Sequence, residues 1–314
     1  MLEVPIFLFT GFLDSGKSTF IRDTLSDDEF ANGQKTLLVL CEEGTEEFDG
    51  DALEKKNVFI ERIDSEDELC TELLQKFQSE YKPRRVIIEY NGMWQVSKLM
   101  DMKLPKHWEV AQVLCTLDAQ VFDMYISNMR SLVMDKVTYA DLVIVNRCAE
   151  NTDQTMFRRN ITAVNRRAQI VYETVDGHVL SPQEEQLPFD ISGSEITIED
   201  DDFGIWYLDV MDHPEKYDGK KVHFKGIVYR NKRIPSGYFV AGRFAMTCCA
   251  DDITFIGILS EYAFADELAV RDWIDVTATV HVRYHSLYEG QGPVLVVDEI
   301  TPSEKPEEDL VYFS

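Results

Sequence analysis

The chain has 314 residues, which is enough for two domains of ordinary size or for one large domain. Its residues are 45% hydrophobic and 28% charged, as in a folded globular protein, so the composition does not predict disorder. The 31 basic and 57 acidic residues give a formal net charge of -26. A field of this sign repels phosphate backbones and anionic lipid headgroups, so it argues against nucleic acid and membrane surfaces as partners and favours metal cations.

Three observations predict a cytoplasmic protein without a membrane span. The sequence contains no apolar run of about 18 residues, the length that a bilayer requires. The opening stretch "MLEVPIFLFT" lacks the basic region of an export signal and is typical of a buried first strand. The cysteines are too sparse for a disulfide scaffold, which fits a reducing compartment. They are Cys41, Cys70, Cys115, Cys148, Cys248 and Cys249.

The first half of the chain alternates short β-branched runs with longer helical patterns. Several of the runs are apolar enough to be buried on both faces, which predicts a mostly parallel sheet flanked by helices. The expected strands are residues 5–9, 35–40, 84–90, 111–118, 140–146 and 169–173. The expected helices include residues 16–25, 66–81 and 151–165.

The first strand runs directly into the segment "GFLDSGKST", residues 11–19. Gly11, Gly16, Lys17 and Ser18 satisfy the pattern G-x-x-x-x-G-K-[ST], and a strand before and a helix after it are the context that a phosphate-binding loop requires. The glycines let backbone N–H groups curl around phosphate oxygens at the positive end of the helix. Lys17 is expected at the β- and γ-phosphates and Ser18 at Mg²⁺. The other nucleotide-binding residues predicted in this loop are Asp14, Ser15 and Thr19.

Three further segments follow in order: "VLCEEGTEEFD" (39–49), "VIIEYNG" (86–92) and "ADLVIVNR" (140–147). With "TLDAQVF" (116–122) and "NRRAQI" (165–170), their order and spacing resemble the CobW-type metallochaperone P-loop GTPases across about residues 4–175. The resemblance implies an Mg²⁺-dependent nucleoside triphosphatase that delivers a metal, with zinc expected, to a client protein. It favours GTP as the substrate and leaves ATP open.

The resemblance also assigns roles to residues in these segments. Glu42, Gly44 and Asp49 fall on the family's switch segment, and Glu89 and Gly92 on its E-x-x-G element. Carboxylates in these places are candidates to hold Mg²⁺ or to orient the attacking water, and the Gly92 N–H to sense the γ-phosphate. The expected Mg²⁺ set is Ser18, Glu42, Asp49 and Glu89, and the expected catalytic set is Lys17, Glu42 and Glu89. Asn146 and Arg147 are expected at the nucleotide, whereas Glu43, Glu46 and Glu47 favour a solvated loop.

The chain departs from the family's pattern in two places. The motif N-K-x-D, whose aspartate accepts hydrogen bonds from guanine, here ends in Ala149, unless Glu150 substitutes for it in a shifted loop. The thiolate cluster C-x-C-C is missing, and Cys70, on the pattern of helix 66–81, is more typical of a core residue. Cys41, beside Glu42, is either part of a nucleotide-sensitive transition-metal site or a buried thiol.

After a linker predicted at residues 179–195, the chain carries almost only strand signal. A short helix within 199–217, with Trp206 and Tyr207 buried, is expected to precede five strands. Five strands with a helical insert between the third and fourth predict a small all-β, OB-like barrel over residues 196–314, after a first domain at 1–178. The strands are expected at 221–230, 237–247, 253–261, 272–282 and 293–302.

The second half resembles the C-terminal part of YcgQ-like proteins, small bacterial proteins associated with predicted permeases. The points of resemblance are the acidic run before Phe203 and Trp206, the turn "HPEKYDGKKV" and the stretch "RFAMTCCADD". This leaves a second function open: a nucleotide-gated regulatory module of a permease component, with little catalysis. An NTPase with a nucleic-acid-binding barrel is a third possibility, against which the acidic charge argues.

Cys248 and Cys249 are a second candidate transition-metal site, with structural cysteines as the alternative. Adjacent residues of a regular strand point to opposite faces, so both thiols bind one ion only where the strand ends or bulges. Asp251 and Asp252 supply oxygen ligands, and thiolates favour Zn²⁺ or Cu(I). The histidines that could complete the site are His213, His223, His281 and His285.

Overall fold

The computed structural model describes residues 3–44, 48–183, 187–247 and 252–313. The chain divides into two compact units, residues 1–183 and 184–314, and the division falls within the segment predicted as a linker. The predictions for Glu46 and Glu47, and for Cys248, Cys249 and Asp251, lie outside the described residues. Among the residues that are described, no helix is both long enough and apolar enough to cross a bilayer.

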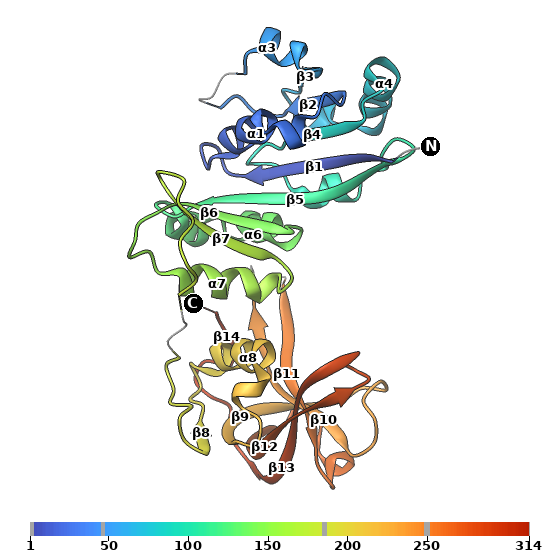
Figure 1. Cartoon of the computed structure of the whole chain (residues 1–314). Coiled ribbons are helices and arrows are strands. Elements are labelled where there is room, and N and C mark those ends of the chain that lie inside the picture. Colours follow the sequence, from blue (N-terminus) through green and yellow to red (C-terminus); the bar gives the residue numbers. More distant parts are fainter. Residues whose placement is uncertain (1–2, 45–47, 184–186, 248–251, 314) are drawn as a thin grey trace. The chain divides into compact units, whose positions relative to one another are not determined.

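The first unit contains a seven-stranded sheet in the order β3-β2-β4-β1-β5-β6-β7, and every pairing in it is parallel (Figure 1). The strands are β1 (Val4–Gly11), β2 (Thr36–Leu40), β3 (Val58–Arg62), β4 (Arg85–Glu89), β5 (Trp108–Asp118), β6 (Leu142–Cys148) and β7 (Gln169–Thr174). All residues of β2 and β4 are buried, which explains their continuous apolar runs. The predicted fold class is confirmed, but the half-buried edge strand β3 was not predicted.

Helices cover both faces of this sheet because successive side chains of β1 point to opposite faces. Ile6 and Leu8 pack into one core with residues of α4 and α5, whereas Phe9 packs into another core with residues of α1. A third core joins α6 and α7 to β5 and β6. The helices are α1 (Lys17–Ser26), α2 (Asp28–Ala31), α3 (Gly50–Lys55), α4 (Thr71–Tyr81), α5 (Val96–Met100), α6 (Phe122–Thr138) and α7 (Gln154–Val164).

One predicted helix of this unit begins later than its sequence pattern indicates. The pattern over residues 66–81 resolves into a 3₁₀ turn, Glu66–Glu68, followed by α4. Cys70, placed on the helix by the prediction, is instead the extended residue that precedes α4, and its side chain is half-buried. The N–H of Leu74, the fourth residue of α4, donates to the Cys70 carbonyl, so the helix hydrogen bonds start at this residue.

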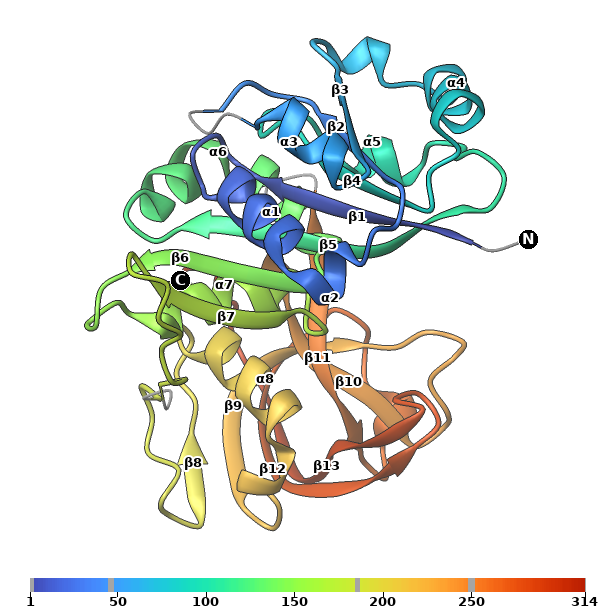
Figure 2. The same ribbon diagram turned by 45° about the horizontal axis from the view of Figure 1, so that its top comes forward.

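The second unit is an all-β sheet whose pairings close on themselves. β9 pairs with β10, β10 with β11, β11 with β13, β13 with β12, and β12 again with β9 (Figures 1 and 2). The short strands β8 and β14 pair with β9 and β10. The strands are β8 (Glu195–Thr197), β9 (Lys221–Tyr229), β10 (Tyr238–Met246), β11 (Ile253–Glu261), β12 (Trp273–His285), β13 (Gly290–Pro302) and β14 (Leu310–Val311).

The helix of this unit lies between β8 and β9 rather than between β11 and β12. α8 (Phe203–Asp212) precedes β9 and buries Trp206, but Tyr207 is only half-buried. Between β11 and β12 the structure has a single 3₁₀ turn, Ala265–Glu267, so the predicted helical insert is wrong. The Asp266 carboxylate binds Arg230 and the Ser236 hydroxyl, which ties this segment to the β9–β10 loop instead of extending a helix.

Candidate functional site

At two places in the loop between β1 and α1, the backbone adopts a conformation that favours glycine. Gly11 and Gly16 have φ angles of 139° and 106°. A Cβ atom on Gly11 would lie 2.4 Å from the Thr116 carbonyl oxygen, and one on Gly16 would lie 2.5 Å from Asn146 Nδ2. Both glycines are therefore required by close approach to neighbouring strands as well as by the turn itself.

Ser15 and Asn146 support this loop from behind. Ser15 Oγ donates to the Phe12 carbonyl at 2.7 Å and lies 2.6 Å from Thr116 Oγ1. Asn146 Nδ2 donates to the Ser15 carbonyl at 3.3 Å. The Ser15 side chain is buried. Both predicted residues therefore lie at the loop, and their side chains hold its shape.

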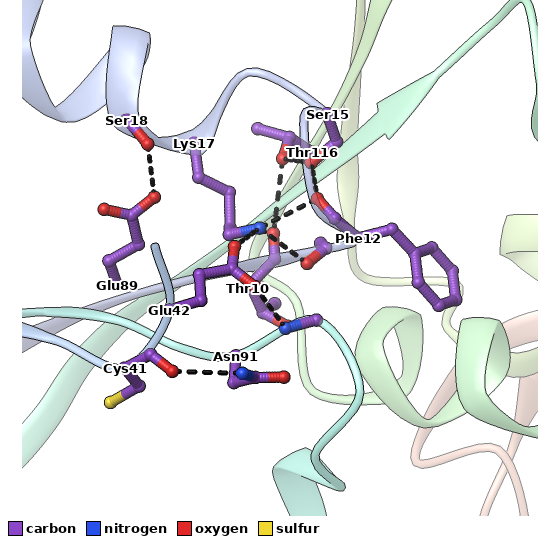
Figure 3. A network of polar contacts seen from close by, with 12 residues as sticks. Thr10, Phe12, Ser15, Lys17, Ser18, Cys41, Glu42, Glu89, Asn91 and Thr116 are labelled. Carbon is purple, nitrogen blue, oxygen red and sulfur yellow. Dashed lines mark hydrogen bonds and ion pairs between the residues drawn. The ribbon is translucent and has the colours of Figure 1, made fainter. Parts of the chain in front are cut away.

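Lys17, the first residue of α1, has its ammonium group buried inside the loop. Nζ donates to the carbonyl oxygens of Gly11 and Phe12, each at 2.8 Å, and forms an ion pair with Glu42 Oε1 (Figure 3). The relative exposure of the two charged side chains is 2% and 8%. An ammonium has three N–H donors, so these three acceptors use all of them.

Glu42 also binds a second group that is predicted to contact phosphate. Its Oε2 accepts the Gly92 N–H at 2.9 Å. A Cβ atom on Gly92 would lie 2.8 Å from Phe12 Cα, so only glycine lets this segment approach the phosphate loop so closely. The Glu42 carboxylate thus holds Lys17 and Gly92 together. All three residues lie far apart in the sequence, so the sequence pattern did not reveal these contacts.

Ser18 and Glu89 place two hard oxygen donors side by side. Ser18 Oγ donates to Glu89 Oε1 at 2.5 Å, and Glu89, at the end of β4, is buried (Figure 3). Burial raises the pKa of Glu89, while the Ser18 hydrogen bond and the charge of Lys17 act in the opposite direction. A hydroxyl and a carboxylate fit Mg²⁺, which usually takes few protein ligands and completes its shell with water and phosphate oxygens.

A cavity of about 180 Å³ lies in front of these groups at the start of α1. The residues that line it are Leu13, Asp14, Gly16, Lys17, Ser18, Thr19, Glu42, Gly44, Glu89 and Arg147.

Asp49 lies elsewhere: its carboxylate caps α3 by accepting the Ala52 N–H at 3.0 Å, and it lines a separate cavity with Phe48. The structure therefore brings most of the predicted phosphate-site residues together, but it does not bring Asp49 to Glu89.

A larger cavity of about 600 Å³ adjoins the first and shares Leu13 and Glu42 with it. Cys41 also lines this cavity, but its thiol is buried, and burial together with the charges of Glu89 and Glu42 raises the thiol pKa. Across residues 3–44, 48–183, 187–247 and 252–313, no three His, Cys, Asp or Glu side chains are arranged to hold a metal ion.

An ion pair beside the segment that is expected to bind the base was not predicted from the sequence. The Arg147 guanidinium contacts Asp118 at 2.5 Å, and the Arg147 N–H donates to Asn146 Oδ1 at 2.7 Å. The feature that could have indicated this ion pair is the position of Asp118 at the end of β5, directly across from Asn146 on β6. Ala149 offers no side-chain acceptor, and Glu150 is exposed.

Comparisons with known proteins agree with the sequence motifs. The nucleotide-binding domain family CobW/HypB/UreG matches residues 5–172, and the family named DUF1980 C-terminal domain matches residues 180–313. The UPF0703 protein YcgQ of Bacillus subtilis matches the C-terminal part, with 26% identity over 121 residues, which is 38% of this chain and 42% of that protein. The chain therefore spans less than half of this relative's length. Both resemblances are confirmed.

Two solved structures are similar to the first unit at low sequence identity. The Zn(II)-bound YjiA GTPase of E. coli is 19% identical, with 56% of this chain and 59% of that chain covered and a TM-score of 0.43. The hydrogenase maturation factor HypB of Archaeoglobus fulgidus is 17% identical, with 55% of this chain and 82% of that chain covered and a TM-score of 0.42.

Proposed function

The chain belongs to the CobW/HypB/UreG nucleotide-binding family, and from this premise we propose that it is an Mg²⁺-dependent nucleoside triphosphatase that prefers GTP. We further propose that it acts in the cytoplasm and couples hydrolysis to delivery of a metal ion, with zinc expected, to a client protein. The observation that carries the proposal is the arrangement of Lys17, Ser18 and Glu89 around one cavity at the positive end of α1.

Each of these groups has a task in binding a triphosphate. The loop N–H groups and Lys17 would bind the phosphate oxygens, while Ser18 and Glu89 would hold Mg²⁺ directly or through water. The metal would supply positive charge against the phosphate oxygens. Catalysis of this kind depends on positioning, so we expect slow turnover in the absence of a partner.

Glu42 couples nucleotide binding to the surface that a partner would contact. Its carboxylate forms an ion pair with the Lys17 ammonium and accepts the Gly92 N–H, and both are donors that a γ-phosphate needs. A triphosphate therefore has to displace Glu42, which also lines the larger cavity beside Cys41 and Glu43. Triphosphate binding would change the charge lining that cavity, and hydrolysis would restore it, which is how a nucleotide switch reports its state.

Phosphate release from GTP tests this function. We expect release by the intact chain with Mg²⁺, and none when EDTA replaces Mg²⁺ or when Lys17 is replaced by alanine. The variant Lys106→Met is a suitable control because this exposed lysine lies away from the cavity. Equal release by the parent chain and Lys17→Ala would contradict the proposal.

The second candidate is a nucleotide-gated regulatory module of a permease component with little catalysis, as the resemblance of the second half to YcgQ-like proteins implies. The two functions differ in what a partner does. A client that accelerates phosphate release supports the first. A partner that is retained by the GTP-loaded chain and released by the GDP-loaded chain, with no acceleration of hydrolysis, supports the second.

A further inference from the structure

Two consecutive residues near the end of α6 hold the segment that follows Gly92. The Asp135 carboxylate accepts the N–H groups of Val96 and Ser97 at 2.5 and 3.3 Å. Lys136 Nζ donates to the Trp94 carbonyl at 3.2 Å. The position of this segment, and with it that of the Gly92 N–H, therefore depends on α6.

The same end of α6 contacts the phosphate loop. Lys136 Nζ lies 5.2 Å from the centroid of the Phe12 ring, within the range of a cation–π interaction. Tyr125, also on α6, stacks on that ring with a centroid distance of 3.9 Å and an interplanar angle of 2°. The Phe12 carbonyl in turn accepts a hydrogen bond from Lys17. Phe12 thus contacts both Lys136 and Lys17, the residue whose ammonium group is expected to bind phosphate.

Lys136 is completely buried, which is rare for a lysine unless it has a partner or a task. Burial lowers its pKa to about 8. Of the titratable groups that face it, Cys115 on β5, Asp135 on α6 and Glu42 raise the pKa, whereas Lys17 on α1 lowers it. An ammonium in this place adds positive charge behind the loop, and the low dielectric of the interior strengthens its effect.

We infer that Asp135 and Lys136 are positioning residues for the triphosphate: they hold the Gly92 segment against the phosphate loop, and the Lys136 charge strengthens anion binding in front of it. The inference rests on the proposed function. It assigns a task to α6, which contributes no side chain to the lining of the smaller cavity.

The charge of Lys136 has a measurable consequence for the pH dependence of binding. A bound triphosphate raises the pKa of Lys136 above its nucleotide-free value of about 8. The added affinity is therefore fully present below about pH 8 and is lost as the pH rises through the pKa of the bound state. Binding in this pH range should therefore take up protons, because a fraction of the nucleotide-free chains has neutral Lys136.

Calorimetry with a non-hydrolysable GTP analogue and Mg²⁺ at pH 8, in two buffers of different ionisation enthalpy, measures this uptake. We expect uptake by the intact chain and by Lys106→Met, which removes one exposed lysine charge from the same unit. Lys136→Gln keeps a donor for the Trp94 carbonyl but loses the charge, so it should take up fewer protons than the parent and bind about tenfold more weakly. Lys136→Met loses both and should bind more weakly still.

The outcomes separate this inference from the proposed function. If Lys136→Gln binds the analogue as tightly as the parent and takes up as many protons, the inference is wrong and the proposed function stands. If the intact chain binds no analogue, the proposed function fails and the inference fails with it. Thermal unfolding checks that each variant is folded, and where Lys136→Gln is not, Lys136→Arg serves instead: it keeps the charge at every pH and should lower the uptake without weakening binding.

Discussion

The Lys17 ammonium and the Glu42 carboxylate form a buried ion pair inside the phosphate loop. Removing the charge of Glu42 while keeping its shape, as in Glu42→Gln, should free Lys17 and the Gly92 N–H for phosphate. Hydrogen bonds to charged groups are worth about 1.5–3 kcal/mol, so we expect the variant to bind a non-hydrolysable GTP analogue about tenfold more tightly. If Glu42 also orients the attacking water, the same variant should hydrolyse GTP more slowly.

Glu43→Gln is the matched control for this measurement, because it removes the same charge from the neighbouring, exposed residue. Calorimetry on the two variants should show a gain of affinity for Glu42→Gln alone. Unchanged or weaker binding by Glu42→Gln would mean that the ion pair does not compete with nucleotide.

The space around Gly92 leads to a second prediction. A methyl group on this residue would lie 2.8 Å from Phe12 Cα and 2.9 Å from the Gly11 carbonyl oxygen, and backbone atoms cannot move away cheaply. Gly92→Ala should therefore lower the free energy of unfolding by about 1–3 kcal/mol and weaken analogue binding as well. Gly50→Ala should change neither, because no atom lies within 4 Å of a Cβ atom added there. Equal melting temperatures for the two variants would contradict the close packing of the loops.

Replacement of Ser18 tests the proposed Mg²⁺ ligand. Ser18→Ala removes the hydroxyl that contacts Glu89, so the gain in analogue affinity on adding Mg²⁺ should fall about tenfold or more. Ser18→Thr keeps the hydroxyl and should preserve the gain. Titrations with and without EDTA measure it, and a full Mg²⁺ effect in Ser18→Ala would exclude this residue as a ligand.

Ala149 leads to a prediction about base selectivity. Ala149 offers no side-chain acceptor for the 2-amino group of guanine, so GTP and ITP, which lacks that group, should bind with similar affinity. Ala149→Asp should favour GTP over ITP by about tenfold or more. Should the parent chain already prefer GTP strongly, Glu150→Gln would show whether Glu150 reads the base in a shifted loop.

The sheet and the phosphate loop could be predicted because their signals are local. The apolar residues of β2 and β4 are contiguous in the chain, and Gly11, Gly16, Lys17 and Ser18 lie within eight residues. The half-polar strand β3 was missed because an edge strand buries too few residues to produce a continuous apolar run.

The contacts within the site could not be predicted, since they join residues that lie far apart in the sequence. Glu42 was expected to act on Mg²⁺ or water, and nothing in a single sequence shows that its carboxylate binds Lys17 and Gly92. The same holds for Asp118 and Arg147. Lys136 carries no motif, and only its burial and its contact with Trp94 draw attention to it.

The central claim is that the loop of residues 11–18 binds a nucleoside triphosphate through Lys17. Calorimetric titration of the intact chain with a non-hydrolysable GTP analogue and Mg²⁺ tests it most directly, with Lys17→Ala as the test variant and Lys106→Met as the control. We expect one saturable site in the parent and in Lys106→Met. In Lys17→Ala the affinity for the analogue should fall about a hundredfold or more, since a buried charge-assisted contact is removed. Equal affinity of Lys17→Ala and the parent, or no binding by the parent, would contradict it.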